Sequence, residues 1–238
     1  AVSNITINGT GAYGYFDATG TTFPFNTEGI MIASGDISNA EGTNSSGSSG
    51  SSLGGSSDPD LAMLIPGYTI YDATILEFDF VLSSDTIEFQ YIFGSDEYPE
   101  FVGSSFNDVF GFFLSGPGIS GIYSGGAINI ALIPGTTLPV TIDNVNDGSY
   151  STYYVDNTGG DACEYDGFTV PLTATAIVTA CETYHIKLAV GDAGDSSYDS
   201  GVFFAAGSFD SGGNVIMENP DPIYGDNNEL YEGCENYY

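Results

Sequence analysis

The sequence is short of positive charge. It has 238 residues, with one Lys or Arg against 32 Asp and Glu, so its formal net charge is −31. Salt bridges within the chain therefore cannot neutralise most of the acids. Carboxylates that lie close together must raise one another's pKa or recruit a cation. This charge repels the phosphate backbone of nucleic acids and anionic membrane surfaces, which excludes both as partners.

Other residue types that mark common protein classes are scarce or missing. The chain has no Trp, one His and three Cys, and so few His and Cys do not favour a zinc protein. No apolar run approaches the roughly 20 residues that cross a bilayer, so direct membrane insertion is not expected. The chain begins at Ala1 without an initiating Met. This start predicts a processed, secreted protein, extracellular or at the cell surface, or else a fragment.

The three cysteines are Cys163, Cys181 and Cys234. Cys163 and Cys181 bracket a segment with the pattern of a strand between two turns. We expect a disulfide between them, with two free thiols as the alternative. An odd number of cysteines in an exported protein leaves one over. Cys234, in an acidic tail, is the one left over here, and its partner stays open.

What the chain does contain is typical of β structure. Hydrophobic residues make up 42% and aromatic residues 14% of the chain, too much apolar surface for a disordered acidic protein. In LEFDFVL, Leu76, Phe78 and Phe80 alternate with polar residues, and IEFQYIF repeats this pattern. Many such runs, separated by Gly, Pro, Asn and Asp, predict an all-β fold: an antiparallel β-sandwich, jelly-roll-like in arrangement.

The chain divides most simply into one domain and a linker. We expect a single β-sandwich domain over residues 1–217. Within it, residues 43–57 read TNSSGSSGSSLGGSS and predict a flexible surface loop. Residues 218–238 are acidic and interrupted by Pro, and they predict an exit linker.

The acids are clustered at strand ends and in Gly- and Ser-rich loops. Loops at one end of a sandwich converge, and carboxylates gathered without bases favour a hard cation. Ca²⁺ binds six to eight oxygens with flexible geometry, so we expect calcium as the cofactor. Solvated turn residues are the alternative reading, because Asp and Asn favour turns for backbone reasons. The expected ligands are Asp96, Glu97, Glu100, Asn107, Asp108, Asp192, Asp195 and Asp199.

Two further groups of acids have weaker patterns. Asp58 and Asp60 lie together in SSDPDL. The run IDNVNDG, residues 142–148, does not match an EF-hand loop, because Val145 stands where a ligand should be.

An enzyme is not expected. Asp96 with Glu100, or Asp192 with Asp195, could in principle supply the acid and base of a glycosidase. Loop acids in an uncompensated cluster are more often ligands or solvated groups. A Ser–His–Asp set would need His185, which strand alternation places on a sheet face together with Lys187. No catalytic residue is therefore assigned.

Lys187 and the tyrosines have simple interpretations and functional ones. Lys187 is expected either to serve solubility or to pair with an acid such as Glu77, Asp79 or Glu88. Exposed tyrosines could stack on sugars, although such residues more often cover a sheet. Those tyrosines are Tyr13, Tyr15, Tyr150, Tyr153 and Tyr154.

Long blocks of the sequence resemble a known family. They include GSDEYPEFVGSSFNDVFGFFLSGPG, NIALIPGTTLPVTIDNVN, YDGFTVPLTATA and TYHIKLAVGDAGDSSYDSGVFFAAGSF. In these blocks the chain resembles the choice-of-anchor L domains of bacterial surface proteins, common in Bacteroidetes. The resemblance implies an N-terminal module of a large secreted protein with a variable C-terminal anchor, and many such proteins are presumed adhesins or gliding-type surface filaments. It also implies that EGC, at Cys234, starts a following module.

Together, the residues and the resemblance predict a non-enzymatic, calcium-stabilised module of a bacterial adhesin or surface filament. Its expected partners are other domains of the same protein, neighbouring copies in a homo-oligomer or filament, and a glycan or cell-surface ligand. A carbohydrate-binding module is the first alternative, and an extracellular hydrolase is the second.

Overall fold

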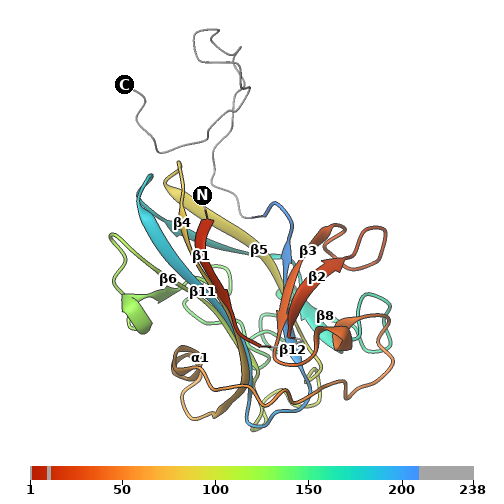
Figure 1. The fold of residues 1–238 in the computed structure, drawn as a ribbon. Coiled ribbons are helices and arrows are strands. Elements are labelled where there is room, and N and C mark those ends of the chain that lie inside the picture. Colours follow the sequence, from red (N-terminus) through yellow and green to blue (C-terminus); the bar gives the residue numbers. More distant parts are fainter. Residues whose placement is uncertain (1, 10–11, 209–238) are drawn as a thin grey trace, which may run out of the picture.

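The structure is a computed structural model that describes residues 2–9 and 12–208. The expected exit linker and Cys234 lie outside the described residues. Within the described part, twelve strands form two antiparallel sheets, as expected for an all-β sandwich (Figure 1). None of the described helices is long and apolar enough to span a membrane.

The first sheet has five strands with the long β11 at its centre. In order, it consists of β1 (Val2–Ile7), β4 (Ile70–Val81), β11 (Thr183–Ala193), β6 (Val109–Ser115) and β7 (Ile128–Asn129). The short helix α1 (Pro59–Leu64) contacts β6 and β11. It therefore covers part of the face of this sheet that points away from the other sheet.

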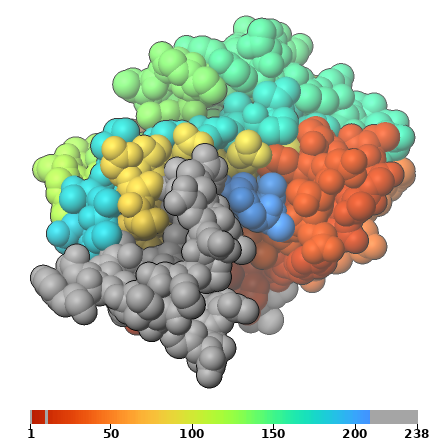
Figure 2. Space-filling model, turned by 90° about the horizontal axis from the view of Figure 1, so that it is seen from above, coloured from red at the N-terminus to blue at the C-terminus, as the bar shows by residue number. Residues whose placement is uncertain are grey.

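The second sheet has seven strands and is built around β5. Its path runs β2 (Tyr13–Asp17), β3 (Glu28–Ala33), β12 (Ser200–Ala205), β5 (Thr86–Ser95), β9 (Gly167–Thr169) and β8 (Tyr154–Asp156), and β10 (Leu172–Ile177) also pairs with β5. Figure 2 shows β12, in blue, between the orange N-terminal strands and the yellow region of β4 and β5. Three short 3-10 helices, η1 (Ile37–Ala40), η2 (Ser124–Gly126) and η3 (Ser151–Tyr153), lie in the connections.

The predicted alternation places the core correctly. Phe80 from β4 and Phe89 and Tyr91 from β5 all lie in the main core between the sheets. Phe112 from β6 packs edge-on against Tyr91, with ring centroids 5.1 Å apart. The opposite face of β5 is covered as well, because Ile92 belongs to a second cluster with Phe203. Burial on both faces explains why these strands read as nearly continuous apolar runs.

Three apolar or turn-rich runs of the sequence do not form a simple strand or a simple turn. The run PVTIDNV, residues 139–145, forms turns and isolated bridges in place of a strand. The long run from Gly167 divides into β9 and β10 around Pro171, which has no N–H to donate to a ladder. Residues 191–201 do not form a simple turn, because β11 ends in the first sheet and β12 begins in the second.

The predicted disulfide between Cys163 and Cys181 is wrong, because Cys163 is a free, buried thiol. Cys163 packs in the second cluster with Phe168, whose partner in β5 is Gly94. Cys181 follows β10, which pairs with the opposite end of β5 at Thr86. Eight residues of strand, about 26 Å, separate these positions along β5, whereas a disulfide joins Cα atoms less than about 7 Å apart.

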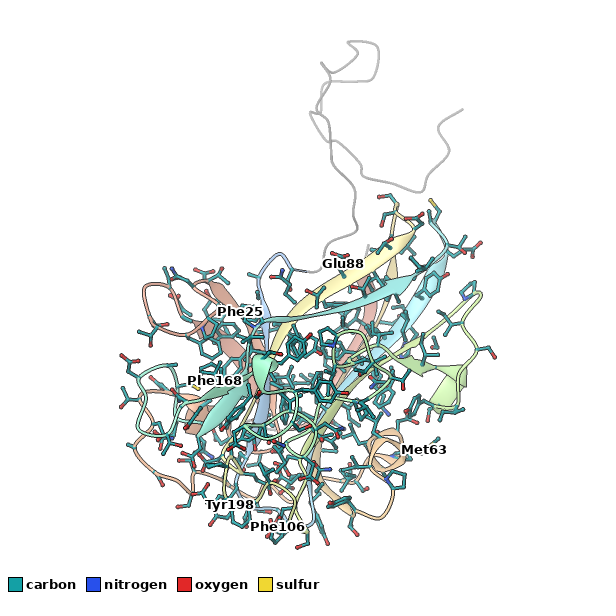
Figure 3. All side chains as sticks on the ribbon, turned by 180° about the vertical axis from the view of Figure 1, so that it is seen from behind. Phe25, Met63, Glu88, Phe106, Phe168 and Tyr198 are labelled. Carbon is teal, nitrogen blue, oxygen red and sulfur yellow. The ribbon has the colours of Figure 1, made fainter. Side chains whose placement is uncertain are left out.

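The two ends of the sandwich differ. At one end lie the end of β5, the end of β11 and the starts of β4, β6 and β12, together with α1 (Figure 1). We call this the loop end. Figure 3 shows Phe106 and Tyr198 together at the loop end, whereas Glu88 lies toward the opposite end.

Candidate functional site

The loop end gathers most of the predicted acidic ligands into one region. Asp96 and Glu97 follow β5, Asp108 precedes β6, Asp192 lies in β11 and Asp199 precedes β12. All five side chains are buried. Strand topology brings them together from three separate parts of the sequence.

The centre of this region is the pair Asp108 and Asp192. Asp192 is 1% exposed, and neither of its carboxylate oxygens has a hydrogen-bond partner. Asp108 is well held: its Oδ1 accepts the N–H of Ala193 at 2.9 Å and its Oδ2 accepts the hydroxyl of Ser200 at 2.7 Å. Glu97 reaches the same place, where its Oε2 accepts the Asp108 N–H at 3.4 Å. Asp192 is thus a buried carboxylate whose two oxygens make no well-formed hydrogen bond, although the nearby Ser34 side chain partly opposes the rise in its pKa.

Burial and mutual repulsion raise the pKa of these groups. For Asp192, burial is the main cause, and the neighbouring charge of Asp108 adds to it. Burial also raises the pKa of Asp108, although the hydrogen bonds from Ser200 and Ala193 oppose this shift. The pKa of Glu97 is raised first by burial and then by the charge of Asp108. At neutral pH such a group must hold a proton or face a cation.

A second group of carboxylates surrounds this centre and is solvated by the chain itself. Residues 44–55, which we call the Ser/Gly strap, run across the loop end. The N–H of Ser49 donates to Asp96 Oδ2, and the N–H of Ser51 donates to Asp199 Oδ1 at 2.9 Å. Glu164 accepts the N–H groups of Ser45 and Ser46, both at 2.9 Å. The strap therefore supplies hydrogen-bond donors to these carboxylates in a chain that has only one Lys or Arg.

The strap continues to a residue that the sequence reasoning overlooked. Asp72, 2% exposed, accepts the hydroxyl of Ser52 at 2.9 Å and the N–H of Gly55. Residues 43–57 were expected to form a flexible surface loop. They lie at the surface, but several of their N–H and hydroxyl groups, from Ser45 to Gly55, donate to carboxylates beneath them. Gly and Ser suit this role because their small side chains let successive N–H groups approach an anion closely.

Asp96 is only partly satisfied by the strap. Its Oδ1 has no hydrogen-bond partner and the residue is fully buried. Burial, with the charge of Asp166 as the next cause, raises the pKa of Asp96 to about 8. Asp166 itself accepts a hydrogen bond from Asn44 at 2.5 Å.

The other predicted ligands lie at the margin of the region. Glu100 is exposed. Asp195 holds its own turn, because its Oδ1 accepts the N–H of Ser197 at 2.9 Å. Asn107 is buried, and its Oδ1 accepts the N–H of Asp143 at 3.1 Å. Glu100 and Asp195 are thus more exposed than the five buried acids, although the charge of Asp195 still contributes to the raised pKa of Glu97.

Three acids that could have been candidates were missed: Asp72, Glu164 and Asp166. All three are buried. Each stands beside apolar residues, in YDATI or CEYDGF, and this is the signal that could have identified them. Across residues 2–9 and 12–208, no three His, Cys, Asp or Glu side chains already converge in the arrangement of a metal site.

Aromatic side chains join the loops that carry the acids. The ring of Phe101 packs edge-on against Phe106 at 5.3 Å between centroids, and it lies 4.9 Å from the ring of Tyr198. Phe106 and Tyr198 are seen side by side in Figure 3. The connection from β5 to β6 is thereby packed against the connection from β11 to β12. Both flank the Asp108–Asp192 pair.

Lys187 lies on the other side of the first sheet, and its expected environment is wrong. Its Nζ is 2.6 Å from Asp58 Oδ2 and 2.7 Å from Asp60 Oδ2, and the residue is buried. Its expected pairing with Glu77, Asp79 or Glu88 is not formed. The reason is that α1 covers this face of β11 and brings its own acids.

His185 takes the place that was expected for Lys187. Its Nδ1 lies 2.8 Å from Asp79 Oδ1, and its Nε2 lies 3.6 Å from Glu77 Oε1. The side chain is half-exposed on the outer face of the sheet, which agrees with the strand alternation. This arrangement is an ordinary surface contact and not part of a catalytic set.

The fold and the loop end define a class: an all-β extracellular-type module whose polar residues hold buried acids without bases. A family model for the choice-of-anchor L domain matches residues 1–210, and the chain belongs to this family. It is accordingly a cell-surface-associated module, of a kind that is generally not catalytic. Searches of curated proteins and of solved structures find no match to the chain.

Proposed function

We propose that this domain is a calcium-stabilised module of a surface adhesin or filament, and that the ion binds at the Asp108–Asp192 pair. The observation that carries the proposal is Asp192, a buried carboxylate with two oxygens that no donor satisfies. An unpaired buried charge is strongly unfavourable, and a cation next to it removes the penalty.

The chemistry of the surrounding residues suits calcium. Asp108 and Glu97 add carboxylate oxygens, and the neighbouring Asn107 carries a side-chain amide oxygen, which accepts the N–H of Asp143. Ca²⁺ accepts such mixed oxygen sets with six to eight ligands, some of them water. Such a site would consist of two or three acids, with water completing the coordination. Asp192 and Asp108 are the residues we assign most directly to it.

The role of the ion follows from where the pair lies. It joins β11 and the start of β6, while the adjacent loops pack through Phe101 and Tyr198. Binding of calcium would hold the loop end in a single arrangement. A surface module needs this rigidity when it contacts a glycan, another cell or a neighbouring copy. The carbohydrate-binding and hydrolase alternatives gain no support of this kind from the described residues.

The direct test is thermal unfolding of the purified chain in millimolar calcium and, separately, in EDTA at neutral pH. Calcium is expected to raise the melting temperature, because a ligand that binds only the folded state stabilises it. Magnesium at the same concentration serves as the control and should have a smaller effect, because it keeps more of its own water. Equal melting temperatures in calcium and EDTA would contradict the proposal.

A further inference from the structure

The chain's single basic residue is held between two carboxylates in an enclosed place. Lys187 is 8% exposed, Asp58 is 3% exposed and Asp60 is 1% exposed. The ammonium nitrogen lies 2.6 Å from Asp58 Oδ2 and 2.7 Å from Asp60 Oδ2. One cation thus meets two anions, so one carboxylate is in excess. Among the described residues of a chain with 32 acids and one Lys or Arg, this is the position where the lysine amine meets carboxyl groups at contact distance.

The surroundings of the amine are apolar. The ring centroid of Phe113 lies 5.1 Å from Nζ, and Phe113 belongs to a buried cluster with Leu61 and Ala189. These side chains come from β6, α1 and β11, and together they shield the three polar groups from bulk water. Figure 3 labels Met63, also on α1, which shows where this helix lies in the molecule.

Both carboxyl groups are held in fixed orientations. Asp58 Oδ1 accepts the N–H groups of Asp60 and Leu61, both at 3.0 Å. Asp60 Oδ1 accepts both the N–H and the hydroxyl of Ser124 at 2.9 Å. In each aspartate, therefore, one oxygen is bound by two donors while the other contacts the amine. The carboxyl carbon is presented to Nζ with its far oxygen already polarised.

We propose that Lys187 and Asp60 condense into an intramolecular amide that links β11 to α1. Burial favours the neutral forms of both groups, but their mutual hydrogen bonds outweigh it, so the pKa of Asp60 is lowered, that of Lys187 is raised and the resting state is an ion pair. The reaction starts from the minor neutral form, in which a proton has passed from the ammonium to Asp60 Oδ2 along their contact. The neutral amine then attacks Cγ of Asp60, and the negative charge that develops on Oδ1 is stabilised by the two donors of Ser124. Asp58 takes a proton from the attacking nitrogen and gives it to the departing hydroxyl. One C–N bond forms, one C–O bond breaks and one water molecule leaves, with no other reactant.

Proximity is what makes this condensation favourable here. Reactive groups fixed at contact distance reach effective molarities of about 10⁵–10⁸ M, which replaces the activation that an amide otherwise requires. Exclusion of water by Phe113 and Leu61 also opposes the reverse hydrolysis. Asp58 has no role as electrophile in this scheme; it acts as the acid–base group.

The bond would have a mechanical consequence. It would close a covalent ring over residues 60–187 and fasten α1, and with it the end of the Ser/Gly strap, to the central strand of the first sheet. In a surface module such a cross-link resists pulling and proteolysis independently of any bound ion. This inference is separate from the calcium proposal, and either can fail alone.

The composition of the chain allows a simple test. Trypsin cleaves after Lys and Arg, so in the reduced and denatured chain it can cut only after Lys187, giving residues 1–187 and 188–238. An amidated Lys187 is not a substrate. We expect the denatured chain to resist trypsin and its intact mass to be lower than the sequence mass by one water. Tandem mass spectrometry should place that loss between Lys187 and Asp60.

Two variants make the result decisive. Lys187→Arg keeps a trypsin site but cannot condense, so its denatured chain should be cut and should have its full mass. Asp58→Asn should leave Lys187 as a free, cleavable amine, because the acid–base group is gone. A wild-type chain that is cut at Lys187 and has its full sequence mass would overturn the proposal. A water loss that maps to any other residue pair would also overturn it.

Discussion

At the scale of single residues, the buried carboxylates differ in which hydrogen-bond donors they have, because the chain offers almost no basic side chains. Asp199 and Glu164 are satisfied by N–H and hydroxyl donors of the Ser/Gly strap. Asp60 shares the single lysine and also accepts hydrogen bonds from Ser124. Asp192 has neither kind of partner. The contrast between these residues is the reason to assign the cation to Asp192.

Replacing Asp192 by Asn tests this assignment. The amide carries no charge, so in EDTA at pH 8 the variant should be more stable than the wild type, because the repulsion between Asp192 and Asp108 is removed. The increase in stability on adding calcium should be lost, because the principal ligand is gone. Urea unfolding with and without calcium measures both effects.

The matched control is Asp195→Asn. Asp195 is half-buried and uses Oδ1 to accept the N–H of Ser197, a bond that an Asn can keep. This variant should retain the full calcium response. If Asp195→Asn loses the response and Asp192→Asn keeps it, the assignment of the site is wrong.

At the scale of elements, the Ser/Gly strap takes over the task that arginines perform in other proteins. Ser52 lies above Asp72 and donates its hydroxyl to Oδ2 at 2.9 Å. Ser52→Ala should lower the free energy of unfolding by about 1 kcal/mol, a typical value for one hydrogen bond at a partly exposed position. Ser57→Ala removes a hydroxyl that has no hydrogen bond within the described residues, and it should be neutral. Chemical denaturation of the two variants compares them; equal losses would refute this role of the strap.

The long strands and their buried faces could be predicted from the sequence, because apolar and polar residues alternate along a strand that has one face in the core. Phe80 and Tyr91 point inward as the pattern requires. The pairing of strands could not be predicted, since β11 and β12 follow one another in the chain but belong to different sheets. The first strands, such as β1, were missed because their residues are mostly exposed and lack a clear apolar face.

The candidate site was predictable in part. The five buried acids were identified because they cluster in loops that a sandwich brings together. Asp72 and Glu164 were not identified, because a single acid among apolar residues resembles an ordinary surface position. The environments of Lys187 and Cys163 depend on which elements cover the faces of the sheets. The local sequence around each residue does not indicate which elements these are.

At the scale of the whole molecule, the fold gathers several of the chain's acids at one end of the sandwich. The loop end contains carboxylates whose pKa is raised by burial, among them Asp96, with a pKa of about 8, and Asp192. A carboxyl whose pKa is higher in the folded state than in the unfolded state binds protons preferentially when folded. Its stabilising effect is present at low pH and is lost as the pH rises from the unfolded pKa, near 4, to the folded pKa.

A bound cation should replace those protons. Calcium binds the ionised carboxylates and neutralises them as their protons leave, so it should offset the loss of stability at higher pH. Acids whose pKa is lowered, such as Asp60 and Asp36, lose their contribution only at more acidic pH. Measurements from pH 5 upward therefore report mainly on the loop end.

The measurement that tests the central claim most directly is the melting temperature from pH 5 to pH 8, once in EDTA and once in calcium. In EDTA the melting temperature should fall as the pH rises, because the buried carboxyls give up their protons. In calcium it should stay level, so that the two curves separate progressively toward pH 8. Two curves that coincide over the whole range would contradict a cation at the Asp108–Asp192 pair.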